Sequence, residues 1–219
     1  MVQRICLGNV NCYIISGEKG AILVDTGRET SRQMVLEACR PYNVRLIVLT
    51  HGHVDHVQNA PFLSEALSCP VAMSGADIPL LRDNMLQPLS ARSLLGKLVL
   101  GASIKSFHKD KIPPFVPDMV LEEGASLDAY GVQAKIISLP GHTKGSIGID
   151  VMERDLIVGD ALMNLFYPTV SMLYHDRTAM LQSAARISGM GARRIYFGHG
   201  RSIRNREWLG HEIHRSSAI

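Results

Sequence analysis

The sequence predicts one α/β domain over residues 1–219, arranged as a four-layer αββα sandwich with two sheets inside and helices outside. Three observations support this prediction. Short apolar runs alternate with stretches of helical periodicity. The alternation occurs in two halves, separated by a helical insert at about residues 76–118. A chain of 219 residues with 46% hydrophobic and 20% charged residues can also bury a sizeable core.

The first half is expected to begin with strands and to continue as strand–helix units. Apolar runs separated by glycine-rich turns indicate a strand meander over residues 2–25. The elements expected after it are a helix at 31–40, a strand at 44–49, a helix at 55–68 with Pro61 near its start or kinking it, and a strand at 70–74.

The insert at residues 76–118 differs from the segments around it. Leucines recur at roughly helical spacing up to Leu100, and a proline-rich stretch ends the segment, so two helices are predicted. Most of these leucines are expected to face the core. The alternative is a lid over a functional site, or a dimer contact, because long excursions in compact domains are often functional.

The second half returns to strands and ends in helices. Strands are expected at 119–121, 131–137, 146–151, 155–158 and 194–197. A helix is expected at 176–187, after Asp176 as a candidate N-cap, and a short helix is expected near 207–214.

One short stretch carries most of the functional information. His51, His53, Asp55 and His56 follow the apolar run 44–49 within a few residues. Imidazole nitrogens and carboxylate oxygens are ligands of zinc and similar divalent ions. Because ligands bind beyond the carboxyl ends of strands in open α/β sheets, this spacing predicts a metal site there.

Further candidate ligands have the same placement. His142, Asp160 and His199 each come after an apolar strand, with a glycine directly before the residue. Each could be an ordinary turn or cap residue on its own. Together with the first motif they predict that several strand ends bring their ligands to one edge of the sheets.

Composition restricts which partners and which cellular location are expected. A net charge of +3 is too small to indicate nucleic acid as a partner. No apolar run is long enough to span a membrane, and no apolar leader segment is recognisable at the amino terminus. The four cysteines lack Cys-x-x-Cys spacing and are expected to be buried thiols, which favours a cytoplasmic location.

These motifs resemble the metallo-β-lactamase superfamily, in particular its glyoxalase II-like hydrolase branch. The matching segments cover most of the chain. They are Asn11-Cys12-Tyr13-Ile14-Ile15, Asp25-Thr26-Gly27, Thr50-His51-Gly52-His53-Val54-Asp55-His56, Pro140-Gly141-His142-Thr143-Lys144-Gly145-Ser146, Gly159-Asp160 and Gly198-His199-Gly200.

The resemblance implies a dinuclear site with two divalent metal ions, zinc first and iron or manganese as alternatives. His51, His53 and His142 would bind the first ion, and Asp55, His56 and His199 the second. Asp160 would bridge the two ions together with a water or hydroxide, which makes Asp160 and Asp55 the candidate catalytic carboxylates. Asp25 and Thr143 are expected to support the ligands from behind.

The superfamily contains several chemistries, so the fold alone does not decide the function. We expect hydrolysis of an ester, thioester or lactone in a small acyl substrate, because a metal-activated hydroxide suits acyl bonds. The alternatives are an iron-dependent sulfur dioxygenase or redox enzyme, and a phosphodiesterase or nuclease. Candidate substrate residues are Tyr167, Tyr174 and Arg201. A homodimer is also considered; a membrane or nucleic-acid partner is not expected.

Overall fold

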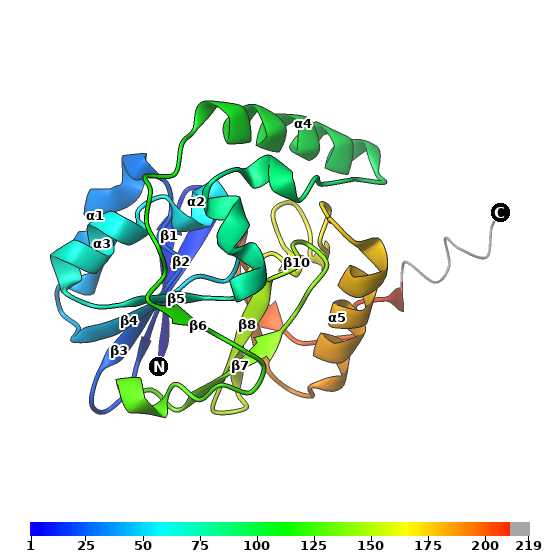
Figure 1. Ribbon diagram of the computed structural model, residues 1–219. Helices are drawn as coiled ribbons and strands as arrows, with labels where there is room; N and C mark the ends of the chain where they lie inside the picture. Colours follow the sequence, from blue (N-terminus) through cyan, green and yellow to red (C-terminus); the bar gives the residue numbers. More distant parts are fainter. Residues whose placement is uncertain (211–219) are drawn as a thin grey trace.

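Two β-sheets packed face to face form the centre of the computed structural model, which describes residues 1–210 (Figure 1). The first sheet has the order β1 (Val2–Leu7), β2 (Val10–Ser16), β3 (Ala21–Val24), β4 (Val44–Val48), β5 (Val71–Met73) and β6 (Met119–Val120). The second has the order β13 (Ile203–Arg204), β12 (Arg194–Tyr196), β9 (Asp155–Ile157), β8 (Ile147–Val151) and β7 (Ala134–Ser138). The short strands β10 (Leu162–Met163) and β11 (Thr169–Val170) pair with each other.

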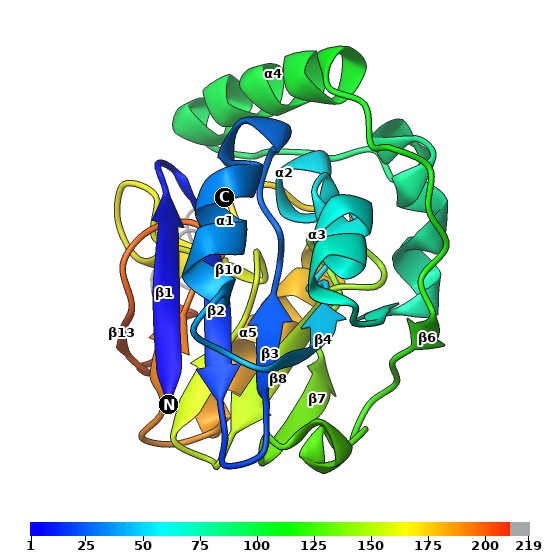
Figure 2. The same cartoon turned by 90° about the vertical axis from the view of Figure 1, so that its left-hand side faces the viewer.

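Helices cover the outer face of each sheet. Helices α1 (Arg32–Cys39) and α3 (Ala60–Leu67) lie on the first sheet, and α5 (Arg177–Gly189) lies on the second (Figures 1 and 2). Shorter helical pieces are α2 (Val54–Val57), η1 (Glu29–Ser31), η2 (Gly75–Leu81), η3 (Asn84–Leu86) and η4 (Asp128–Tyr130). The predicted four-layer αββα sandwich is therefore confirmed.

The alternation of side chains along the strands explains the layers. In β2, Cys12 and Ile14 pack on the helical side, whereas Tyr13 and Ile15 pack between the sheets. Successive side chains of a strand point to opposite faces, so a strand that is apolar at every position must be buried on both sides. The sheet–sheet interior and the two sheet–helix interfaces consequently form three separate apolar clusters.

The helical segments differ from the sequence prediction in detail. The helix expected at 55–68 is divided into α2 and α3, with Pro61 in the first turn of α3, where a missing N–H is tolerated. The second half of the helix expected near 207–214, residues 211–214, lies outside the described part. The helix expected at 176–187 is confirmed as α5, and the Asp176 side chain accepts a hydrogen bond from Ala179 N as its N-cap.

The insert contains one long helix rather than two. Its first part forms the 3₁₀ segments η2 and η3, with Pro79 inside η2, and α4 (Leu94–Lys109) follows. Helix α4 runs across one end of the sandwich, above the edges of both sheets (Figures 1 and 2). Of its 16 residues only Gly96 is buried. The expectation that most leucines of the insert face the core is wrong for Leu86, Leu94 and Leu98, which are 54%, 82% and 74% exposed.

Cys12, Cys39 and Cys69 are buried free thiols, whereas Cys6 is exposed, so the expected burial is wrong for Cys6. No helix among the described residues is long and apolar enough to cross a membrane.

Candidate metal centre

The predicted ligands come together beneath α4, at the ends of four strands. His51, His53, Asp55 and His56 lie in the segment that leaves β4 and enters α2. His142 follows β7, Asp160 follows β9 and His199 follows β12. Ligands from both sheets therefore meet at one edge of the sandwich, as the strand-end placement predicts.

Three sets of side chains place one potential ligand atom each within 4.8 Å of the others. They are His51, His53 and His142; His51, His56 and Asp160; and Asp55, His56 and His199. The first and third sets coincide with the two groups implied by the family resemblance.

Asp160 lies between these groups. Its Oδ2 is 3.2 Å from His199 Nε2 and 3.7 Å from His142 Nε2. Its Oδ1 is 3.7 Å from His56 Nε2. One carboxylate thus faces imidazoles of both groups, which is the position that a bridging ligand requires.

Outer partners orient the imidazole rings. His142 Nδ1 donates to Leu173 O at 2.8 Å, and His199 Nδ1 donates to Asn9 O at 2.6 Å. When Nδ1 carries the proton, the lone pair of Nε2 is left to face the centre. His53 is turned differently, since its Nδ1 is the atom that lies 3.0 Å from His142 Nε2.

Several of the inward-facing atoms have no protein partner. Within the described part of the chain, His51 Nε2, His56 Nε2 and Asp160 Oδ1 are buried and accept or donate no hydrogen bond. Leaving such atoms unpaired is costly, and a divalent cation would satisfy them together. The donor set, imidazole nitrogen and carboxylate oxygen, is the one that zinc and iron accept. The residues present therefore fit a divalent metal centre.

The protonation states of His51 and Asp160 agree with this assignment, whereas the carboxylates of Asp25 and Asp160 outweigh burial and raise the pKa of His56 to about 10 while no cation is bound. Burial, together with the neighbouring His56 and His53, lowers the pKa of His51 well below its usual value, so the ring is neutral. Burial would raise the pKa of Asp160, but the imidazoles of His199 and His56 outweigh it and hold this pKa well below its usual value. A neutral imidazole and an ionised carboxylate are the protonation states that bind cations.

Asp25 supports the centre from behind, as the sequence suggests. It accepts hydrogen bonds from His56 Nδ1 at 2.8 Å and from the backbone and hydroxyl of Thr50 at 2.8 and 2.9 Å. Its φ of 58° lies in the left-handed region, which aspartate tolerates better than most side chains. Asp25 therefore fixes the ring of His56 and the start of the first ligand segment.

The other supporting carboxylate, Asp77 of η2, is not predicted from the sequence. It is fully buried and accepts hydrogen bonds from Gly52 N at 3.0 Å, Gly145 N at 2.8 Å and Thr143 Oγ1 at 2.6 Å. Thr143 thus acts through Asp77 and not on an imidazole. Because Gly52 and Gly145 flank different ligands, Asp77 joins the His51–His53 segment to the His142 segment.

The backbone directly before His199 passes so close to Asp160 and His56 that only glycine fits there. A Cβ atom on Gly198 would lie 2.1 Å from Asp160 Oδ1 and 2.8 Å from His56 Cε1. Any side chain at this position would displace the ligands, which explains the glycine in the Gly-His motif.

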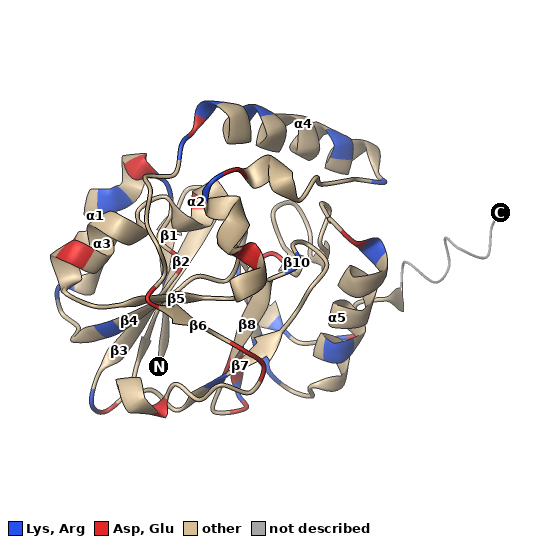
Figure 3. Cartoon of the chain, viewed as in Figure 1, with Lys and Arg blue, Asp and Glu red and all other residues tan. Residues whose placement is uncertain are grey.

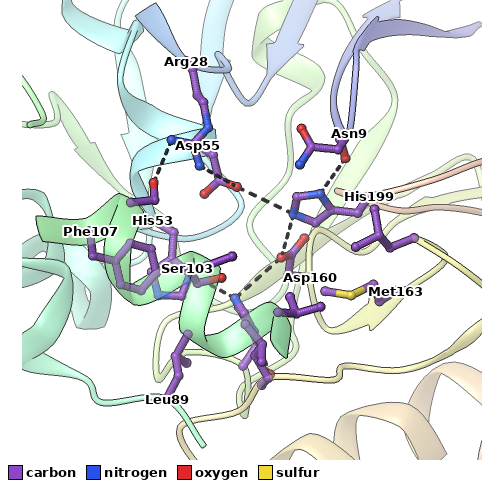
Figure 4. Close-up of a pocket in the computed structure, with 16 residues that line it drawn as sticks. Asn9, Arg28, His53, Asp55, Leu89, Ser103, Phe107, Asp160, Met163 and His199 are labelled. Carbon is purple, nitrogen blue, oxygen red and sulfur yellow. Dashed lines mark hydrogen bonds and ion pairs between the residues drawn. The ribbon is translucent and has the colours of Figure 1, made fainter. Parts of the chain in front are cut away.

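A cavity of about 220 Å³ opens over the centre. Its lining includes His53, Asp55, His142, Asp160 and His199 together with residues of α4 (Figure 4). Phe107 of α4 stacks on His53 with ring centroids 4.8 Å apart. Helix α4 therefore covers the site directly.

The three candidate substrate residues lie elsewhere. Tyr167, Tyr174 and Arg201 do not line this cavity. Tyr167 is 53% exposed, the backbone of Tyr174 pairs with Ser90, and Arg201 is exposed. A role for them in substrate binding stays a prediction that the cavity does not support. Arg28, by contrast, lines the cavity and is not identified by any sequence motif.

Comparison with known proteins agrees with this architecture. Residues 7–199 match the family model described as the metallo-beta-lactamase superfamily. An uncharacterized protein of Aquifex aeolicus is 32% identical over 156 residues, which cover 70% of this chain and 65% of the relative. The hydroxyacylglutathione hydrolase GloC of Haemophilus influenzae is 30% identical over 155 residues, covering 69% and 66%. The alignments thus span slightly less than two thirds of the length of these relatives.

Among solved structures, the crystal structure of TTHA1623 in a di-iron-bound form is similar. The TM-score is 0.66 at 26% sequence identity, over 93% of this chain and 94% of that one.

Proposed function

The chain belongs to the metallo-beta-lactamase superfamily, and from this membership we propose that it is a metal-dependent hydrolase of an ester, thioester or lactone. The observation that carries the proposal is the position of Asp160 between two imidazole groups, with buried ligand atoms that no protein group satisfies. Such an arrangement suits two cations sharing one carboxylate.

The proposed ligand sets are His51, His53 and His142 for one ion, Asp55, His56 and His199 for the other, and Asp160 for both. Divalent cations held there would lower the pKa of a bound water and polarise the bond to be cleaved. Zinc and iron are both candidates, because the donor set suits either and the similar TTHA1623 structure is described as di-iron-bound.

Two further roles in the proposed reaction, proton transfer and exclusion of water, are assigned to side chains of the protein. Asp55 lies near Arg28 and His199, at 3.7 and 3.8 Å, with its carboxylate at the cavity wall. Asp55 is therefore our candidate for the group that accepts a proton from the attacking water. Phe107 packs on His53 and, with the rest of α4, excludes bulk water from the acyl group.

The proposed substrate is a small acyl compound. The cavity volume of about 220 Å³ is below the usual range for ligand pockets, which favours a short acyl chain. The relative from Haemophilus influenzae is described as a hydroxyacylglutathione hydrolase. Because an acylglutathione is a thioester, a thioester is the first candidate substrate. A cytoplasmic location and a homodimer stay predictions.

The test is a panel of initial rates with a glutathione thioester, an acyl-homoserine lactone, an aryl ester, a β-lactam and a phosphodiester. Each compound is offered to metal-loaded and to chelator-stripped protein. The expected result is metal-dependent turnover of one acyl class. Metal-dependent cleavage of the phosphodiester alone, or no turnover by fully metal-loaded protein, would contradict the proposal.

A further inference from the structure

The lining of the cavity over the candidate metal centre is chemically mixed. Its apolar part, the apolar wall, consists of Leu89, Val99, Phe107, Met163, Leu165 and Leu173. Arg28 lies on the side away from Leu89, next to Asp55 (Figure 4). Among the described residues that line this cavity, Arg28 is the only lysine or arginine. A ligand that contacts both the apolar wall and Arg28 must be apolar in one part and anionic in another.

The Arg28 guanidinium has donors that its present partners do not use. Its Nη1 donates to Asp110 Oδ2 and, at 2.8 Å, to Ser106 Oγ. Its Nη2 lies 3.7 Å from Asp55 Oδ2, which is longer than a hydrogen bond. A guanidinium binds a carboxylate best through two parallel N–H···O bonds. Arg28 therefore has the capacity to hold a carboxylate in the cavity.

The present partner of Arg28 can be replaced at small cost. Asp110 directly follows α4, and α4 is attached to the rest of the molecule by few buried side chains. Asp110 Oδ2 also accepts a hydrogen bond from Ser106 Oγ at 2.8 Å, so it keeps a partner when Arg28 turns away. The Arg28–Asp110 ion pair is partly exposed, at 32% and 27%, and such pairs contribute little.

The charge of the covering helix favours an anionic ligand as well. Helix α4 carries Lys97, Lys105 and Lys109 and no acidic residue (Figure 3). These lysines are exposed and lie outside the cavity lining, so each one contributes only a weak long-range attraction for anions.

We propose that Arg28 is the residue that determines substrate specificity, and that it binds a carboxylate carried by a short acyl ester or thioester in place of Asp110. The inference rests on the proposed function and narrows its substrate class. The substrate would present its acyl carbonyl to the metal centre and its carboxylate, a few carbon atoms away, to Arg28. Its methylene groups would contact the apolar wall.

A structural role of Arg28 leads to different expectations. If Arg28 only fastens α4 through Ser106 and Asp110, then loss of Arg28 and loss of the Asp110 charge should act alike. Both changes would loosen α4 and would affect charged and neutral substrates equally.

The test uses two matched thioesters of N-acetylcysteamine, one with a butyryl and one with a succinyl group. They differ by a methyl group that is replaced by a carboxylate. The metal-loaded variants are Arg28→Gln, Asp110→Asn and, as a control, Lys105→Gln. The control removes a positive charge from α4 at an exposed position outside the cavity lining.

Arg28→Gln is expected to raise KM for the succinyl thioester by about 10- to 100-fold, as for a lost charge-assisted hydrogen bond, and to change KM for the butyryl thioester by less than about twofold. Asp110→Asn is expected to lower KM for the succinyl thioester, because it removes the competing carboxylate. Lys105→Gln should leave KM for both thioesters within about twofold of the wild-type values. Equal effects of Arg28→Gln on both thioesters would overturn the proposal.

A binding measurement separates this inference from the proposed function. Succinamate and butyramide, the unreactive amides of the same acyl groups, are titrated calorimetrically into metal-loaded wild type and Arg28→Gln. Tighter binding of succinamate that is lost in Arg28→Gln supports the inference even if no thioester is cleaved, in which case only the proposed function fails. Succinamate binding that is absent in the wild type, or unchanged in Arg28→Gln, overturns the inference even if the thioesters are hydrolysed.

Discussion

Asp160 is the single residue on which the proposed chemistry depends most. Asp160→Asn keeps the size of the side chain but replaces an oxygen that faces the imidazoles with an amide nitrogen. We expect turnover to fall by at least about 100-fold, with less metal bound per chain, because an amide cannot bridge two cations.

The measurements for Asp160→Asn are kcat on the best substrate of the panel and metal content after dialysis. Asp155→Asn, on the strand that leads to Asp160, is the control and should leave both unchanged. Full activity of Asp160→Asn at full metal occupancy would contradict the assigned role.

Asp77 is expected to matter for both stability and metal affinity. In Asp77→Asn the amide nitrogen replaces either Oδ2, which accepts from Gly52 N and Thr143 Oγ1, or Oδ1, which accepts from Gly145 N and Gln87 Nε2. Two donors therefore lose their acceptor in a fully buried place. The expected cost is about 2–5 kcal/mol of unfolding free energy. The expected loss of metal affinity is about 10- to 100-fold, because both ligand segments lose their common support.

Urea unfolding and competition with a chromogenic chelator measure the two effects of Asp77→Asn. Asp83→Asn, at an exposed position in the same insert, should change neither. An unchanged metal affinity in Asp77→Asn would show that the two ligand segments are positioned independently of each other.

For single residues, the sequence predicts the candidate metal ligands better than it predicts the residues that position them. His51, His142 and Asp160 are recognisable because each follows an apolar strand at a spacing that metals require. Asp77 and Arg28 stand in no such pattern. Their partners lie far away along the chain, as with Asp77 and Gly145, so only the folded structure brings the contacts together.

Among the elements, α5 forms an ion pair with Glu123, in the loop between β6 and η4, and this pair gives a pH-dependent prediction. Glu123 accepts hydrogen bonds from Arg186 Nη2 at 2.7 Å and from Ser138 N at 2.6 Å. The Arg186 guanidinium lowers the pKa of Glu123 from 4.5 to about 2. Because the pKa is lower in the folded state, the stabilisation is complete above the unfolded value and is lost as pH falls from 4.5 towards 2.

We therefore expect Glu123→Gln to lower the unfolding free energy near neutral pH by at most about 1 kcal/mol, since the pair is half exposed. Urea unfolding of the variant and the wild type should converge as the pH is lowered below about 4. The neighbouring exposed Glu122→Gln serves as the control. A difference that persists unchanged at low pH would exclude Glu123 ionisation as its source.

The long elements are predictable from the sequence, and the short ones are not. Strands such as β2 and helix α5 carry enough residues for periodicity and caps to show. Strands β10, β11 and β13 have two residues each, too few for any pattern. In the insert, leucine spacing indicates helix, but Pro79 and the hydrogen bonds of Asp77 hold its first part in 3₁₀ turns.

For the whole molecule, the candidate metal centre lies where the two sheets meet. His51, His53, Asp55 and His56 follow a strand of the first sheet, whereas His142, Asp160 and His199 follow strands of the second. Cations bound between them would act as cross-links that exist only in the folded state. With free metal at about a thousand times its dissociation constant, the expected stabilisation is about 4 kcal/mol.

Thermal unfolding with and without a chelator tests whether bound cations stabilise the fold. The chelator should lower the unfolding midpoint, and excess metal should restore it. Hydrogen exchange should speed up in β4 and β9 together when the metal is removed, because each leads to ligands of the same ions. Exchange that changes on only one sheet would contradict a centre shared by both.

The path of the insert has a consequence for how new specificities can arise. Strands β5 and β6 are neighbours in register, Ala72 beside Met119, so the chain leaves and re-enters the sheet at adjacent points. The early part of the excursion, up to Gln87, is tied to the ligand segments, since Gln87 bonds both Asp77 and Lys144 N. The remainder, from Pro88 to Pro117, contains none of the proposed metal ligands. Recombination there would replace α4 and its share of the cavity wall, including the Phe107 ring on His53, without removing a candidate ligand.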